Sequence, residues 1–148
     1  MSMPQEMQQL QQEMQQLEQE KQALREEVEG LRDEQSEIDE AIEALETLES
    51  GSIVQVPVGG GAHVRAEVED IDEVVVSLGG GYAAEHEQDE AVETLESKKE
   101  ALDDRIDEVE AEIEEVEQQS AQLEQQAQQM QQQQMQMMQQ QAQEQDDE

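Results

Sequence analysis

Apart from its 41 acidic side chains, this 148-residue chain has few residues of the types that perform catalysis or bind a metal ion. Cysteine is absent, which excludes thiolate metal sites and disulfides. The two histidines, His63 and His86, are too few and too scattered for a metal or catalytic group. The glycine runs at 59–61 and 79–81 lack the Lys-Ser/Thr step and the following helix of a phosphate loop. We therefore expect no catalytic residue, no metal and no cofactor, and the chain is not predicted to be an enzyme.

The remaining chemistry is apolar contact by methionine and leucine side chains near both ends of the chain. Methionine is unbranched and polarisable, so it fits irregular apolar partners with little demand on their shape. The simpler alternative is that these side chains only close the last turns of a helical seam. The residues concerned are Met7, Leu10, Met14, Leu123, Met130, Met135, Met137 and Met138.

Two runs of apolar residues that repeat every seven positions would bring those ends together. A sustained seven-residue period makes an apolar seam along a helix, and a seam requires a partner helix. We predict a mainly α fold in which helices at 5–50 and 86–141 form an antiparallel coiled-coil hairpin. Residues 142–148 are predicted to be a disordered acidic tail. The repeats are Leu10, Leu17, Leu24, Leu31, Ile38 and Leu45 in the first helix, and Leu95, Leu102, Val109, Val116, Leu123, Met130 and Met137 in the second.

Some seam positions are polar, among them Lys21, Gln35 and Lys99. Polar residues at core positions of a coiled coil fix its register and pairing. In the antiparallel register Gln35 and Lys99 fall level, so we predict that the two polar sites satisfy each other.

Between the predicted helices, residues 52–85 alternate between apolar and polar side chains, which is typical of strands. The segment Val-Pro-Val-Gly-Gly-Gly-Ala at 56–62 recurs as Val-Ser-Leu-Gly-Gly-Gly-Tyr at 76–82. We predict two similar β-hairpins whose turn glycines adopt positive φ. Isolated hairpins are marginal in water and have open edges, so we expect strands of other subunits to complete an oligomerisation platform. Its predicted residues are Val54, Val56, Val58, Val64, Val74, Val76, Leu78 and Tyr82.

The charge balance limits the partners of the chain. Forty-one acidic residues against seven basic ones give a net charge of -34, which disfavours nucleic acid because phosphate binding needs clustered Lys and Arg. No run approaches the about 18 apolar residues of a membrane span, and the first residues lack the pattern of a secretory signal, so a cytoplasmic location is expected. We hypothesise adaptation to a salt-rich cytoplasm, where charges are screened within a few ångströms.

The insert carries a recognisable pattern. From Val54 to Val64, an apolar strand runs through a Val-Pro-Val step into Gly-Gly-Gly, and the segment from Val74 to Tyr82 ends in Gly-Gly-Gly-Tyr. With the flanking heptads and the chain length, this pattern resembles the archaeal prefoldin α subunit family. Two hairpins, not one, favour the α type over the β type. The chain departs from the family in its extreme acidity and in alanines at 83 and 84, where aromatic residues are often found.

The resemblance implies a hexamer of two α and four β prefoldin subunits, in which the hairpins join an intersubunit β-barrel platform and the coiled coils extend from it. It also implies ATP-independent capture of non-native client proteins and their transfer to a group II chaperonin. On this interpretation, the terminal methionines and leucines contact clients at the coiled-coil tips. The alternative function is that of a structural coiled-coil scaffold or tether that binds no client.

Overall fold

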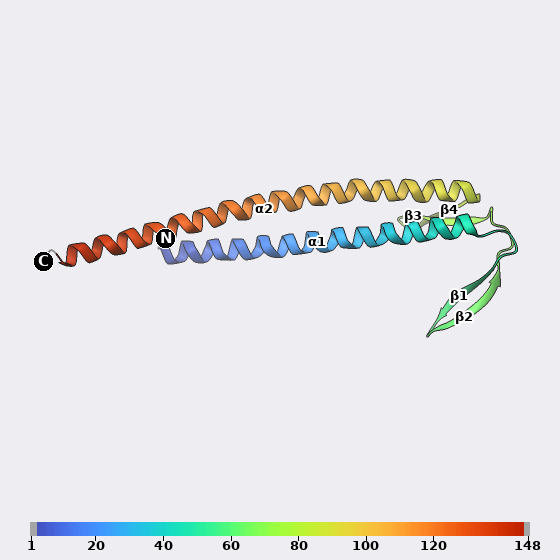
Figure 1. Cartoon of the computed structure of the whole chain (residues 1–148), viewed down its shortest axis with the longest axis horizontal. Coiled ribbons are helices and arrows are strands. Elements are labelled where there is room, and N and C mark those ends of the chain that lie inside the picture. The colour runs from blue at the N-terminus through green and yellow to red at the C-terminus, as the bar shows by residue number, and fades with distance from the viewer. Residues whose placement is uncertain (1–2, 147–148) are drawn as a thin grey trace. The chain divides into compact units, whose positions relative to one another are not determined.

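The computed structural model describes residues 3–146. The predicted fold class, two long helices with two antiparallel β-hairpins between them, is confirmed. The chain divides into two compact units: a coil unit, which takes in the residues up to Glu29 and from Asp107 onward, and a hairpin unit, Gly30–Ile106. In chain order the elements are α1 (Met3–Thr47), β1 (Ile53–Gly59), β2 (Ala62–Glu67), β3 (Val74–Gly79), β4 (Tyr82–His86) and α2 (Gln88–Asp146) (Figure 1).

In the coil unit, α1 and α2 pack through the predicted heptad positions. Val109 is fully buried, and the apolar seam positions of this unit are buried or half-buried as far as Met130. Leu17 and Leu123 line one groove along the seam, and Leu10 and Met130 line another. Residue numbers rise on one helix as they fall on the other, so the helices are antiparallel, as predicted.

The core of the hairpin unit lies where β3 meets both helices. Val76 of β3 is buried together with Ala91 and Leu95 of α2. Because this cluster combines a strand with both helices, the chain's own helices hold the hairpin formed by β3 and β4. The partly buried side chains packed around it are Ile38, Ile42, Leu45 and Val74.

The C-terminal end of α1 is capped by the first residue of α2. The side-chain amide of Gln88 donates hydrogen bonds to the carbonyl oxygen of Leu45 in the last turn of α1 and to that of Leu48 just after it. The end of an α-helix leaves its last carbonyl groups without intrahelical partners. Gly51, with a φ of 92°, turns the chain towards β1. The helix ends at Thr47, slightly before the predicted limit at 50. The cap thus joins the end of α1 to the start of α2.

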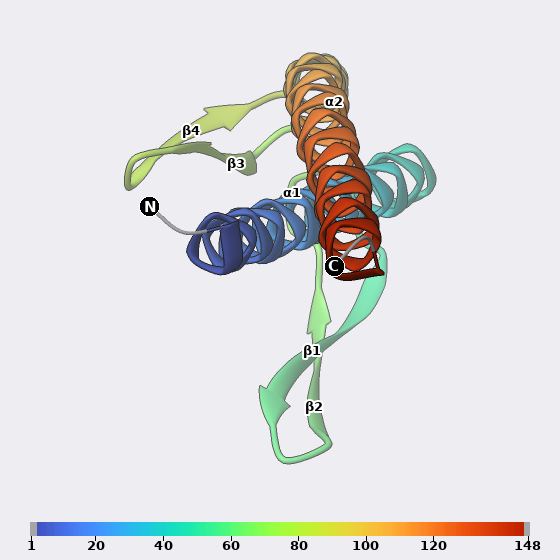
Figure 2. The ribbon, with the colours of Figure 1, turned by 90° about the vertical axis from the view of Figure 1, so that its left-hand side faces the viewer.

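Each hairpin forms its own two-stranded antiparallel sheet. Val56 pairs with Val64 in the first hairpin, and Val76 pairs with Ala84 in the second. A β-bulge interrupts each register just before the glycine turn, and all the turn glycines have positive φ, as predicted. The two hairpins leave the helix ends in different directions (Figure 2).

Helix α2 is longer than the sequence predicts. The predicted disordered tail at 142–148 is wrong for residues 142–146, which continue α2, and residues 147–148 lie outside the described residues. Glutamine, methionine and alanine are good helix formers, and neither glycine nor proline interrupts α2. Within the range 3–146, neither helix is long and apolar enough to cross a membrane.

Candidate functional site

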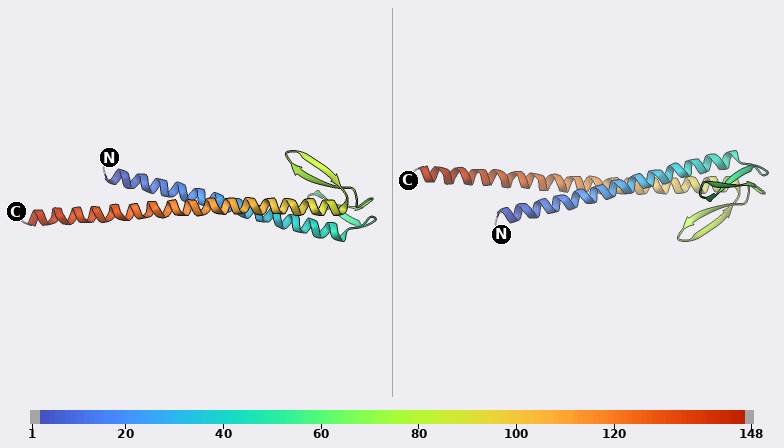
Figure 3. Two further views of the ribbon diagram at one scale, coloured as in Figure 1. Left: turned by 90° about the horizontal axis from the view of Figure 1, so that it is seen from above. Right: turned by 90° about the horizontal axis from the view of Figure 1, so that it is seen from below.

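The C-terminal end of α2 extends beyond its contact with α1. Every described side chain from 131 to 145 is exposed, whereas Met130 is still half-buried. Figure 1 shows this end of α2, in red, continuing past the N-terminal end of α1, and the two views of Figure 3 show the same extension. We call residues 131–145 the overhang.

The overhang divides the predicted client-contact residues into two groups. Met135, Met137 and Met138 lie on it and are 65%, 60% and 72% exposed. Only this first group offers its apolar surface to a partner while the two helices stay paired. The second group is half-buried in the coil unit and consists of Met7, Leu10, Met14, Leu123 and Met130.

The overhang methionines project from different sides of α2. With 3.6 residues per turn, Met135 and Met138 lie within about 60° of each other around the helix axis. Met137 lies about 160° from Met135, on the line of the heptad seam. An apolar partner can therefore contact this helix end from either side.

The hairpins carry a second exposed apolar surface. Aliphatic side chains beside open strand edges are typical of a surface that further strands cover. The exposed residues are Ile53, Val56, Val58 and Val64 on the first hairpin, and Val75, Leu78 and Tyr82 on the second.

The predicted platform residues are therefore only partly accessible. Val76 is buried against the chain's own helices, and Val54 and Val74 are half-buried, whereas the other five are exposed. The sequence analysis missed Ile53 and Val75, which are also exposed. Strand alternation could have identified Val75, because a residue next to an inward-facing one on a strand faces outward.

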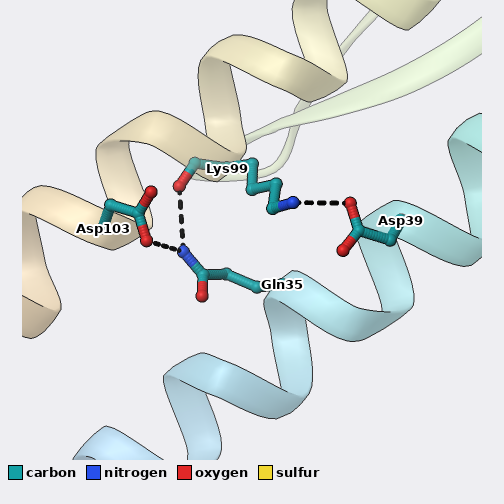
Figure 4. Close-up of polar contacts among 4 residues, drawn as sticks. All are labelled: Gln35, Asp39, Lys99 and Asp103. Atoms are coloured by element: carbon teal, nitrogen blue, oxygen red, sulfur yellow. Dashed lines mark hydrogen bonds and ion pairs between the residues drawn. The ribbon is translucent and has the colours of Figure 1, made fainter.

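A polar layer interrupts the seam in the hairpin unit (Figure 4). Gln35 Nε2 of α1 donates to the Lys99 carbonyl oxygen at 3.2 Å and to Asp103 Oδ1 at 2.5 Å. The Lys99 ammonium donates to Asp39 Oδ1 of α1 at 2.8 Å. Gln35 and Lys99 lie level, as predicted, but each polar side chain binds a carboxylate of the facing helix and not the other side chain.

Lysine and arginine side chains, which are rare in this chain, form ion pairs between the two helices in both units. The hydrogen bond to Asp39 raises the pKa of the Lys99 ammonium above its ordinary value, because it favours the charged form. In the coil unit, Lys21 and Arg25 of α1 both approach Glu117 of α2, at 3.7 and 3.5 Å. Pairs of this kind disfavour other registers of a coiled coil, because a shift would separate them.

The histidines lie apart on the two hairpins. His63 is exposed on β2, and His86 at the end of β4 is half-buried, with Nδ1 3.9 Å from a Glu90 carboxylate oxygen. In the part of the chain that the structure describes, no group of three or more histidine or carboxylate side chains could hold a metal ion.

Comparison with known proteins gives consistent matches. A family model described as a prefoldin subunit matches residues 17–133. Prefoldin subunit alpha of Haloarcula marismortui is 75% identical over 68 residues, which are 46% of this chain and 44% of that protein. Prefoldin subunit alpha of Halorubrum lacusprofundi is 65% identical over 69 residues, 47% and 45% of the respective chains. The chain thus matches less than half the length of these curated relatives.

A solved structure is similar to this chain in fold. A chain in the cryo-EM structure of filamentous PFD from Methanocaldococcus jannaschii is similar with a TM-score of 0.66 and 30% sequence identity. The similarity covers 74% of this chain and 93% of the other. It therefore includes most of both molecules, whereas the curated relatives match over shorter segments.

Proposed function

The chain belongs to the prefoldin family, and on that basis we propose that it is an α-type subunit of an ATP-independent holdase, which captures non-native proteins without catalysing a reaction. One observation supports this most directly: three methionines are exposed on a helix end that α1 does not cover. Flexible apolar side chains can bind partners of irregular shape in a protein without a deep pocket.

Assembly is proposed to use the hairpins. Each two-stranded sheet has two open edges and exposed aliphatic side chains, which strands of other subunits would cover. The proposed assembly is a hexamer of two α and four β prefoldin subunits in the cytoplasm, joined through an intersubunit β-barrel platform.

Several overhangs in one assembly would bind the same client at the same time. A single group of three methionines offers little apolar area, so its affinity for a client is low. Linking several such groups raises their effective concentration and increases the overall affinity without any new type of contact. Weak individual contacts also permit release, which the proposed transfer to a group II chaperonin requires.

The test replaces the overhang methionines and leaves the hairpins unchanged. In the assembled complex, Met135→Gln, Met137→Gln and Met138→Gln together should remove most of the protection of a chemically unfolded client, measured as light scattering. The reason is that full burial of one such side chain contributes about 1.5–3 kcal/mol. Assembly, measured by size-exclusion chromatography, should not change.

A matched control alters exposed glutamines of the same helix that lie before residue 125. Gln118→Ala, Gln119→Ala and Gln122→Ala together keep the methionines and should protect the client as the wild type does. Equal protection by the methionine variant and the wild type would refute the proposed capture by the overhang.

A second candidate function is that of a structural scaffold. It is favoured by the likeness to a chain of filamentous PFD, because a subunit of a filament can act as a spacer without binding clients. A wild-type complex that assembles but never retains an unfolded client would support this alternative.

A further inference from the structure

Most of the overhang, residues 131–143, lies within the longest uncharged stretch of a strongly acidic chain. No residue from 125 to 143 is charged, although the net charge of the chain is -34. Glutamine occupies most exposed positions around the three methionines, where the preceding part of α2 has glutamate and aspartate. The acidic residues just before this stretch include Asp107, Glu108, Glu110, Glu112, Glu114, Glu115 and Glu117.

The nearest charge before the methionines on α2 is several helical turns away from them. The nearest charge after them is more than one turn away. At a rise of 1.5 Å per residue, Met135 lies about 16 Å along the axis from Glu124, and Met138 lies about 9 Å from Glu144. Electrostatic interactions in water are screened over about 8 Å at physiological ionic strength. On α1, only Glu6 is acidic before Glu13. The acidity of the chain is therefore largely screened at the overhang methionines.

This distribution of charge distinguishes between classes of client. Like charges 4 Å apart in water repel by about 1 kcal/mol, so a glutamate-rich surface would disfavour acidic clients and attract basic ones. A surface for basic clients would keep the acidic composition of the preceding helix. Glutamine removes that repulsion, and its amide can both donate and accept hydrogen bonds with a client backbone.

We propose that residues 125–143 form a charge-neutral contact surface through which this acidic chain captures non-native polypeptides of net negative charge. Methionine provides the apolar contact, and glutamine provides polar contact without repulsion. The inference rests on the proposed holdase function and adds the class of client to it.

The experiment uses one unfolded client in two charge states. Lysozyme that is reduced and blocked with iodoacetamide is cationic, and succinylation of its lysines makes the same chain anionic. Dissociation constants for the assembled complex are measured by fluorescence anisotropy at 0.15 M salt. The wild type should bind both forms within about threefold, because the contact surface contributes no net Coulomb energy.

Charges placed in the neutral stretch should then create selectivity. Gln132→Glu, Gln136→Glu and Gln139→Glu together should weaken binding of the anionic client by about tenfold or more, because three added like charges contribute on the order of 1.4 kcal/mol or more. Binding of the cationic client should not weaken. At 1 M salt, where the screening length is about 3 Å, the loss should largely disappear.

The control adds the same charge elsewhere on α2. Ala111→Glu, Gln118→Glu and Gln119→Glu are exposed positions before the stretch, and together they should leave anionic binding within about threefold of the wild type because of screening. Helix content of all variants is checked by circular dichroism.

The outcomes separate this inference from the function on which it rests. If the wild type binds neither form of the client, the proposed holdase function is wrong. If it binds the cationic form but rejects the anionic one, the function stands and the inference is overturned. Equal losses in the two glutamate variants would also overturn the inference, since total charge and not its position would then control binding.

Discussion

The two β-hairpins repeat one sequence pattern but differ in how much the rest of the chain covers them. Val56 and Val76 occupy the same place in the repeated segment, yet Val56 is 43% exposed and Val76 is 6% exposed. Their connections explain the difference. Only Glu87 separates β4 from α2, whereas residues 48–52 separate α1 from β1. The shorter connection keeps the second hairpin against the helix that follows it.

The difference assigns separate roles to similar sequences. Hairpin β3–β4 uses one face for the core of its own unit, with Val76 inward and Val75 69% exposed on the other side. Hairpin β1–β2 has exposed side chains on both strands and no buried residue. The second hairpin therefore stabilises the single chain, whereas the first keeps more of its apolar surface exposed and available for the proposed assembly.

The largest expected effect comes from a charge placed in the docked hairpin. Val76→Asp should destabilise the chain by about 3–5 kcal/mol, because it leaves an unpaired carboxylate in a small apolar core. The measurement is thermal unfolding followed by circular dichroism on the purified chain. A melting curve like that of the wild type would mean that the second hairpin is not docked in solution.

The matched change in the open hairpin should have a different consequence. Val58→Asp lies at an exposed position and should change the stability of the single chain by about 0.5 kcal/mol or less. It should instead weaken assembly with partner subunits, measured by analytical ultracentrifugation. Similar losses of chain stability in both variants would contradict the contrast between the hairpins.

This contrast also shows how far the sequence predicts the structure. The helices, their antiparallel pairing and both hairpins follow from periods of seven and two, which are local properties of the chain. The burial of Val76 depends on the one-residue connection between β4 and α2 and on contacts with both helices. Val56 occupies the same place in the repeat and is exposed, so the repeat alone would wrongly predict an exposed Val76. The exposure of the overhang depends on α2 continuing past the start of α1, and a heptad pattern does not determine where a partner helix stops.

A smaller effect is expected from the polar contact that holds the second hairpin. Lys98 Nζ of α2 donates to the Ser77 carbonyl oxygen at 2.8 Å. Lys98→Met should cost about 0.5–1.5 kcal/mol, the usual contribution of one hydrogen bond. We expect faster amide hydrogen exchange in β3 and β4, and unchanged exchange in β1 and β2.

Arg65→Met provides the control for the lost charge. Arg65 is exposed on β2, so this variant has the same net charge without altering the Lys98 contact. Exchange in β3 and β4 should then match the wild type. If Lys98→Met also leaves that exchange unchanged, the apolar core alone holds the hairpin.

The smallest effect concerns Lys99, which contacts α1 and not a hairpin. Because the hydrogen bond to Asp39 raises the pKa of Lys99 in the folded state, this contact stabilises the fold below the ordinary value of 10.5. The stabilisation is lost as the pH rises through the folded-state pKa. Urea unfolding midpoints should therefore fall at alkaline pH more steeply in the wild type than in Lys99→Met. Asp39→Asn should flatten the curve in the same way. Hydrogen exchange in β3 and β4 should stay at the wild-type rate, because Lys98 makes the contact with the hairpin and Lys99 makes the contact with α1.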